Sequence, residues 1–138
     1  MVETLALSAA GLPYFLLYLA ASFVLVGLFI LLYVQVTPQR EIMLLRQGNA
    51  AAAVSFGGAV IGFIIPLSQS VAQSFNLLDM ALWSLVALVV QLALFFLANL
   101  LVQDAGRKIT EGDLGTAGFL AITAVGGGML NAACMTYG

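Results

Sequence analysis

The sequence predicts an all-α membrane protein with four transmembrane helices in a single membrane domain, residues 1–138. Of its 138 residues, 63% are hydrophobic and 7% are charged, a composition far outside that of soluble globular domains. The charged residues fall in short clusters separated by long uncharged runs. Several runs approach the length of roughly 20 residues that crosses the hydrocarbon core of a bilayer.

The four predicted spans are residues 13–36, 49–67, 78–102 and 113–135. The second span is the shortest, and we expect Pro66 to close it, with the polar residues 68–70 beyond its end. The segment before the first span carries Glu3 and no lysine or arginine, whereas a signal peptide begins with positive charge. The first span is therefore predicted to be retained.

The basic residues predict the orientation of the chain. All of them lie between spans one and two or between spans three and four: Arg40, Arg46, Arg107 and Lys108. Connections rich in lysine and arginine face the cytoplasm. Both termini are therefore expected on the outer side of the membrane.

Each basic connection has the pattern of a short interfacial helix. The first begins with Thr37 and Pro38, a capping and first-turn pair, and the second begins at Asp104. Each ends in a glycine, which suits the left-handed exit from a helix, and then in a residue that caps the next span. The loop and cap residues assigned in this way are Arg40, Glu41, Arg46, Gly48, Asn49, Arg107, Lys108, Gly112 and Asp113.

The two connections also indicate an internal repeat at an offset of 64 residues. Residues 47–49 fall on residues 111–113, and Gly62 falls on Gly126. This pattern predicts two tandem two-helix units, residues 13–67 and 78–135, in parallel orientation. Coincidence is the alternative, because glycine and alanine matches are common in membrane helices.

Several short motifs resemble one bacterial family. They are Thr37-Pro38, Glu41-Ile42, the runs at residues 46–52 and 78–83, and Leu130-Asn131-Ala132-Ala133. They resemble the YjfL-like inner-membrane proteins, the family of domain of unknown function 350, over residues 13–137. The resemblance implies a bacterial inner-membrane protein made of two copies of a two-helix unit, without an assigned activity. It also implies an association with envelope stress or polyamine conjugation.

Small residues recur at four-residue spacing in the second and fourth spans. They are Gly58, Gly62, Ala124, Gly128 and Ala132. In lipid, such faces let two helix backbones approach closely, and packing there drives helix association. The contact is either within one chain or between subunits, and the spacing does not distinguish the two.

Uncharged polar residues interrupt the spans. They are Ser55, Gln91, Asn99, Thr123 and Asn131. A polar side chain in hydrocarbon needs a partner on another helix or a water-filled cavity. These residues therefore either join helices by hydrogen bonds or line a pore, and Gln91 is the foremost pore candidate because it lies near the middle of its span.

The residue types exclude several classes of function. The chain has no histidine and one cysteine, so we expect no metal site, disulfide or cofactor, and Cys134 is expected to be a small packing residue. No ionisable residue lies deep in a span, so an enzyme is not expected. The net charge of −2 argues against a nucleic-acid partner.

Two functions remain open. The first is a homo-oligomeric, channel-like or small-solute permeation component of the inner membrane, linked to envelope homeostasis, with any pore between subunits. The second is a non-conducting scaffold or anchor that recruits envelope-stress or polyamine-conjugation partners through its cytoplasmic loops. The expected partners are membrane lipid, further copies of the chain, and cytoplasmic or membrane proteins.

Overall fold

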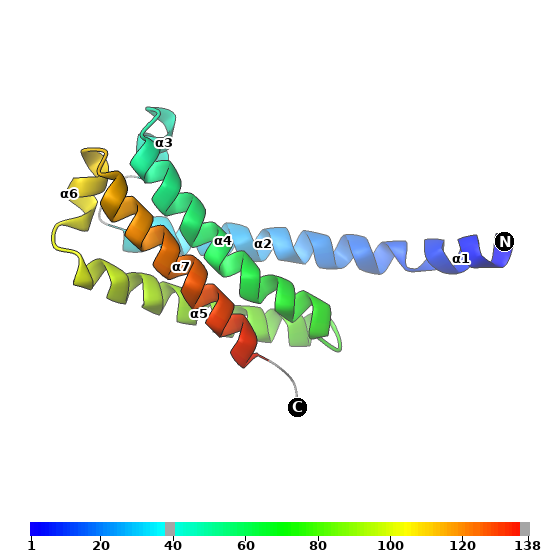
Figure 1. Cartoon of the computed structure of the whole chain (residues 1–138). Helices are drawn as coiled ribbons and strands as arrows, with labels where there is room; N and C mark the ends of the chain where they lie inside the picture. Colours follow the sequence, from blue (N-terminus) through cyan, green and yellow to red (C-terminus); the bar gives the residue numbers. More distant parts are fainter. Residues whose placement is uncertain (38–40, 136–138) are drawn as a thin grey trace.

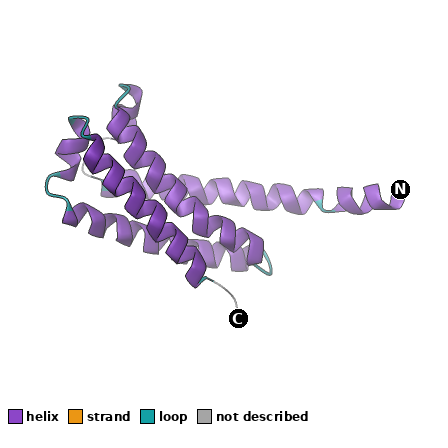
Figure 2. Cartoon of the chain, in the orientation of Figure 1, coloured by secondary structure: helices purple, strands orange, loops and turns teal. Residues whose placement is uncertain are grey.

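The computed structural model of the chain describes residues 1–37 and 41–135, with the backbone alone at Glu41. These residues form seven helices and no strand (Figure 2). Their bounds are α1 Val2–Ala10, α2 Leu12–Val36, α3 Glu41–Arg46, α4 Ala50–Gln73, α5 Leu77–Leu101, α6 Ala105–Thr110 and α7 Leu114–Cys134. The all-helical prediction is confirmed.

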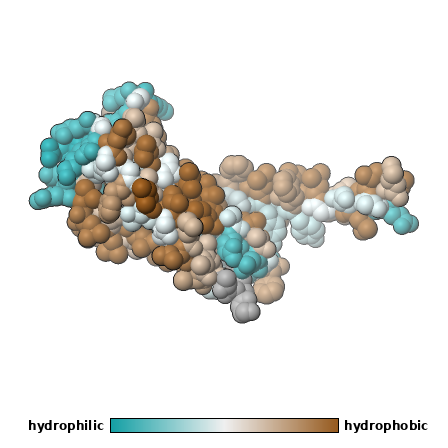
Figure 3. All heavy atoms as spheres, in the orientation of Figure 1, coloured by the Kyte–Doolittle hydropathy of each residue, from teal (hydrophilic) through white to brown (hydrophobic). Residues whose placement is uncertain are grey.

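Four helical segments are long and apolar enough to cross a membrane: Val2–Val36, Ala50–Gln73, Leu77–Leu101 and Leu114–Cys134. Each predicted span lies within or close to one of them. Figure 3 shows the largest hydrophilic surface over α3 and α6, smaller hydrophilic patches at the opposite end of the bundle and at the N-terminus, and hydrophobic surface over the long helices. This distribution suits a bundle that lies in a bilayer with its more polar end at α3 and α6.

The predicted end of the second span is wrong, because α4 continues through Pro66 to Gln73. The proline removes one helical hydrogen bond, but the two serines beyond it find carbonyl acceptors, one on α4 and one on α5. The Ser68 hydroxyl donates to the carbonyl of Ile65 at 2.8 Å, and the Ser70 hydroxyl donates to the carbonyl of Met80 on α5 at 2.9 Å. A polar run therefore did not mark a loop here.

The connection from α4 to α5 is correspondingly short. Asn76 caps α5, since its Oδ1 accepts from the backbone N–H of Asp79 at 2.8 Å. The Asp79 carboxylate in turn accepts from the backbone N–H of Phe75 at 3.1 Å. This reciprocal pair of bonds satisfies donors at the helix start and fixes the tight turn.

Three helices form the centre of the bundle. Helices α4 and α7 lie side by side and run in the same direction, and α5 contacts both (Figure 1). Helix α2 contacts α4 and α5 through its C-terminal half, where Leu25, Phe29 and Tyr33 are buried. Its N-terminal half and α1 extend away from the bundle, and α1 buries no residue.

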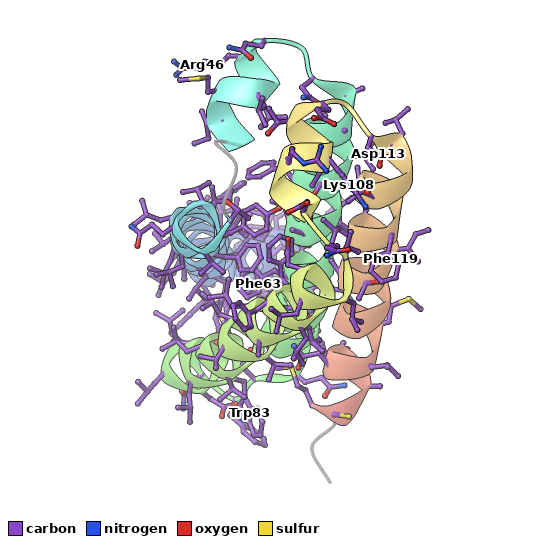
Figure 4. The ribbon with its side chains drawn as sticks, turned by 90° about the vertical axis from the view of Figure 1, so that its left-hand side faces the viewer. Arg46, Phe63, Trp83, Lys108, Asp113 and Phe119 are labelled. Atoms are coloured by element: carbon purple, nitrogen blue, oxygen red, sulfur yellow. The ribbon has the colours of Figure 1, made fainter. Side chains whose placement is uncertain are left out.

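Aromatic side chains hold α2 to the bundle. The rings of Phe29 and Phe63 stack with centroids 4.8 Å apart, and Tyr33 meets Phe95 edge to face at 4.6 Å. Figure 4 shows Phe63 among the side chains between α2 and the other long helices. Such pairs stabilise a contact by about 0.5–1.5 kcal/mol beyond the area they bury.

A second apolar cluster ties the short helices to the end of the bundle. Leu44 of α3 and Ile109 of α6 are buried with residues from α4, α5 and α7. Short helices thus occupy both predicted connections. Their position at the membrane interface stays a prediction, as does the internal repeat.

Candidate functional site

Backbone-to-backbone contact joins α4 and α7 along the small-residue seam, which we define as Gly58, Gly62, Ala124, Gly128 and Ala132. A Cβ atom added at Gly58 would lie 2.5 Å from Cα of Ala121, and one added at Gly128 would lie 2.9 Å from the carbonyl carbon of Gly62. Neither position leaves room for a side chain, because the obstacle is backbone. All five seam residues are buried.

The seam shows whether these small residues pack within one chain or between subunits, which the sequence left open. Its small residues pack within one chain, between α4 and α7, and they are not on the surface of that chain. The alternative, in which these residues meet another subunit, is not the arrangement observed. The sequence could not distinguish the two, because the spacing needed is the same for both.

An amide layer lies beside the seam, formed by Gln91 of α5 and Asn131 of α7. Gln91 is only 2% exposed, and its Nε2 donates to the carbonyl of Ala124 at 3.2 Å. Asn131 Nδ2 donates to the carbonyl of Ala87 at 3.2 Å and to Gln91 Oε1 at 3.4 Å. The two amides therefore bind helices to one another.

Two further polar candidates, Asn99 and Thr123, take no part in this layer. Asn99 donates from Nδ2 to the carbonyl of Phe95, on its own helix, at 2.9 Å, and its buried Oδ1 has no partner in the described structure. Thr123 is partly buried on α7. The structure thus brings together two of the five predicted intramembrane polar residues, Gln91 and Asn131.

A pair of buried serines forms another polar contact, which was not predicted from the sequence. The Ser84 hydroxyl donates to Ser70 Oγ at 3.2 Å, and both residues are buried between α4 and α5. A signal was present, because Ser84 lies seven residues before Gln91 and so on the same helix face. Ser55 is 1% exposed, and its hydroxyl has no partner among the described residues.

The Gly48-Asn49 pair, which connects α3 to α4, also links α4 to α6. Gly48 has φ of +79°, and Asn49 Oδ1 accepts from the backbone N–H of Ala52 at 3.0 Å. The Asn49 amide also donates to the carbonyls of Ile109 at 3.0 Å and Thr110 at 3.2 Å. The sequence predicted the cap but not this bridge, which satisfies carbonyls at the end of α6.

The Gly112-Asp113 pair connects α6 to α7, and Asp113 caps α7. Gly112 has φ of +87°, and the Asp113 carboxylate accepts from the backbone N–H of Gly115 and from the Thr116 hydroxyl, each at 3.0 Å. The bond from the Thr116 side chain is the main reason why the pKa of Asp113 lies below its ordinary value of 3.8, and the charge of Lys108 adds to it. Figure 4 shows Lys108 and Asp113 at the same end of the bundle.

The remaining charged candidates lie on the surface. Arg107 forms ion pairs with Asp104 at 3.5 Å and Glu111 at 3.3 Å, and all three side chains are more than 60% exposed. Such exposed pairs contribute little to stability. Arg46 is exposed at the end of α3 (Figure 4). Arg40 lies outside the described residues, and Glu41 is described by its backbone alone.

The prediction for Cys134 is wrong. This cysteine is exposed, and it lines a shallow surface groove of about 310 Å³ with Gly127 and Asn131. The described part of the chain holds no cluster of three or more metal-ligating side chains. What the site offers chemically is neutral amides and hydroxyls, which form hydrogen bonds but do not ionise near neutral pH.

Comparison with known proteins identifies the family. Residues 6–135 match the Domain of Unknown Function (DUF350). The chain belongs to this family. It is 32% identical over 120 residues to the UPF0719 inner membrane protein YjfL of Escherichia coli strain K12 and, with the same values, to that of strain O157:H7. Each alignment covers 87% of this chain and 91% of the relative.

No solved structure matches the DUF350 chain. The resemblance seen in the sequence motifs is confirmed, and so is the location that it implied. With four apolar helices and this membership, the chain is an inner-membrane protein of unknown function.

Proposed function

We propose that this DUF350 protein is a non-conducting helical module of the inner membrane, which acts by organising other components. One observation carries the proposal: the amide layer is closed within the chain. Gln91, the foremost pore candidate, is 2% exposed and hydrogen-bonded to α7. A water-filled path needs polar groups that face the water.

The seam supports the same conclusion. Helices α4 and α7 meet through backbone atoms at Gly62 and Gly128, which leaves no lumen between them. The grooves of the described chain lie on its surface and are lined mainly by apolar residues. The channel hypothesis consequently requires a pore between copies, lined by side chains other than Gln91.

Flux through liposomes tests the proposal. The purified protein is reconstituted at several protein-to-lipid ratios, and ion flux is followed with an entrapped dye and solute flux by osmotic swelling. A known channel serves as positive control. We expect flux equal to that of protein-free vesicles at every ratio. Flux that rises with the protein-to-lipid ratio would contradict the proposal, and loss of that flux in Gln91→Leu would show that this side chain lines the pore.

We further propose that copies of the chain associate and recruit partners through the polar end of the bundle. The exposed charges of α3 and α6, Arg46 and Arg107 among them, support this surface as the contact for cytoplasmic proteins, including envelope-stress or polyamine-conjugation components. Contacts between copies then use faces other than the buried seam. The mass of the assembly in nanodiscs tests this arrangement, and a strict monomer at all lipid compositions would contradict it.

The proposed orientation places both termini outside and α6 in the cytoplasm, because the basic residues cluster at α3 and α6. A cysteine at position 107, in a Cys134→Ser background, should react with an impermeant thiol reagent only after the membrane is opened. Labelling in intact cells would reverse the orientation.

The internal duplication also remains a proposal. Its support is the register of the parallel pair α4 and α7. The close contacts are Gly62 with Ala124, Gly58 with Ala121 and Gly62 with Gly128. The members of these pairs are separated in the sequence by 62, 63 and 66 positions, which is close to the 64-residue offset that relates the two halves of the sequence. Corresponding positions of two copies meet in this way when an approximate twofold axis runs between their helices.

A further inference from the structure

We propose that the groove between α2 and α4 binds one acyl chain of a bilayer glycerophospholipid, with the ester region of that lipid at the end of α4. This site goes beyond the proposed function and does not depend on it. The observations behind it are the divergence of the two helices, the distribution of hydroxyl groups along the groove, and its length.

The groove opens where α2 leaves the bundle. Helix α2 is held to α4 near Phe29 and Phe63, and its N-terminal half then diverges from the C-terminal part of α4 (Figure 1). Two hollows of about 370 and 330 Å³ lie along this divergence and share Leu19, Ser22 and Val71. They therefore form one continuous groove, the α2–α4 wedge.

The wedge is polar at one end and apolar at the other. At the end of α4 it is lined by Tyr14, Tyr18 and Ser74, and the buried Ser74 Oγ has no hydrogen-bond partner among the described residues. In the other half, the hydroxyls of Ser22 and Ser68 donate to helix carbonyls at 2.7 and 2.8 Å. That half presents mainly apolar atoms, around Leu67 and Ile64.

The length of the wedge matches one leaflet. From Ser74 to Ile64, α4 rises ten residues, or about 15 Å at 1.5 Å per residue. This is half of the roughly 30 Å hydrocarbon core. An acyl chain that starts at the helix end would therefore run the length of the wedge, and the Ser74 hydroxyl would donate to an ester carbonyl of the same lipid.

Other occupants fit less well. If the wedge were empty, the side chains that line it would lose van der Waals contacts on their exposed sides. Water needs two to four polar partners, and the deep half of the wedge offers only the hydroxyls of Ser22 and Ser68, which already donate to helix carbonyls.

Native mass spectrometry of the full chain, purified in mild detergent from its membrane, tests the site. We expect the wild type to retain one glycerophospholipid per chain at collision energies that strip loosely bound lipid. Ser22→Trp, which fills the part shared by both hollows, should reduce the retained fraction at least tenfold. Ser74→Ala should reduce it severalfold, because it removes only the hydroxyl.

A matched control uses an apolar surface of another helix. Val86→Trp places the same side chain in a shallow groove lined by α5 alone, and it should leave lipid retention unchanged. If Ser22→Trp does not fold, as judged by circular dichroism and thermal unfolding, Ala72→Phe replaces it, since Ala72 is exposed at the edge of the wedge. The same loss is expected of it.

Three results would overturn the proposal. The wild type could carry no phospholipid or detergent alone, the filled variant that folds could retain lipid as the wild type does, or Val86→Trp could lose lipid to the same extent as Ser22→Trp. The mass of the released molecule distinguishes a phospholipid from a free fatty acid, and a free fatty acid in its place would also contradict the assignment.

Discussion

Helix α4 meets two neighbours in opposite ways. Against α7 it presents glycines, and the two backbones touch at Gly62 and Gly128. Against α2 it presents aromatic rings, and the helices are joined around Phe29 and Phe63 and then separate. Both partner helices are apolar enough to cross a membrane, so hydrophobicity does not explain the difference.

Side-chain size explains it instead. In lipid, helices associate through close packing and interhelical hydrogen bonds, and not through removal of apolar surface from water. The seam has the close packing, with backbone against backbone at Gly62 and Gly128, and the amide layer beside it joins α7 to α5 by hydrogen bonds. The contact with α2 is made largely by aromatic rings, which join the helices around one crossing and leave the N-terminal half of α2 outside the bundle.

The largest expected effect is from a side chain in the seam. Gly62→Leu would drive its Cβ to 2.7 Å from the carbonyl carbon of Ala124, and backbone cannot move aside. We expect the free energy of unfolding, measured in mild detergent, to fall by about 3 kcal/mol or more. Gly57→Leu is the matched control, because a Cβ there meets nothing within 4 Å, and its effect should stay within about 0.5 kcal/mol. Equal stability of the two variants would break the comparison.

The next effect concerns the contact with α2. Phe29→Ala removes a buried ring that stacks on Phe63, and such truncations cost about 3–5 kcal/mol in well-packed cores. We expect about 3 kcal/mol, because α2 has few other buried residues. Leu28→Ala, at the exposed neighbouring position, should change stability little. A loss below about 1 kcal/mol in Phe29→Ala would mean that the rings do not hold α2.

A smaller effect is expected for the amide layer. Gln91→Leu and Asn131→Leu should each lower the free energy of unfolding by about 1 kcal/mol, the usual size of interhelical hydrogen bonds in membranes. Because the two amides share a bond, the double variant should lose less than the sum. Strict additivity in this double-mutant cycle would show that the side chains act separately.

The smallest expected effect is the pH dependence of folding stability that arises from Asp113. Its pKa is lowered in the folded protein by hydrogen bonds from Thr116, so the ionised carboxylate stabilises the fold. That contribution is present above the unfolded-state value and is lost as pH falls through the lowered folded-state value. We expect thermal stability to decline below about pH 4 and the decline to shrink in Asp113→Asn. An identical acid profile in that variant would contradict the assignment.

Much of the architecture follows from the sequence, because long apolar runs and the glycine-plus-cap pairs at Gly48 and Gly112 have direct physical consequences. The end of α4 did not follow, since Ser68 and Ser70 find carbonyl acceptors in a helix as well as in a loop. The partners of Gln91 and Asn131 did not follow either, because a hydrogen bond between distant segments depends on how whole helices pack. The hydrogen bond from Asn49 to α6 could not be predicted from the sequence for the same reason.

The central claim is that the interior of the bundle is dry, and the access of thiol reagents to its buried serines tests this most directly. Ser55→Cys and Ser84→Cys, each in a Cys134→Ser background, lie in α4 and α5 and preserve side-chain size, and Glu111→Cys gives an exposed reference. We predict that a water-soluble maleimide labels the folded protein at position 111 alone, and labels positions 55 and 84 only after denaturation. Labelling of position 55 in the folded protein at the rate of position 111 would contradict a dry interior and indicate a water path through the chain.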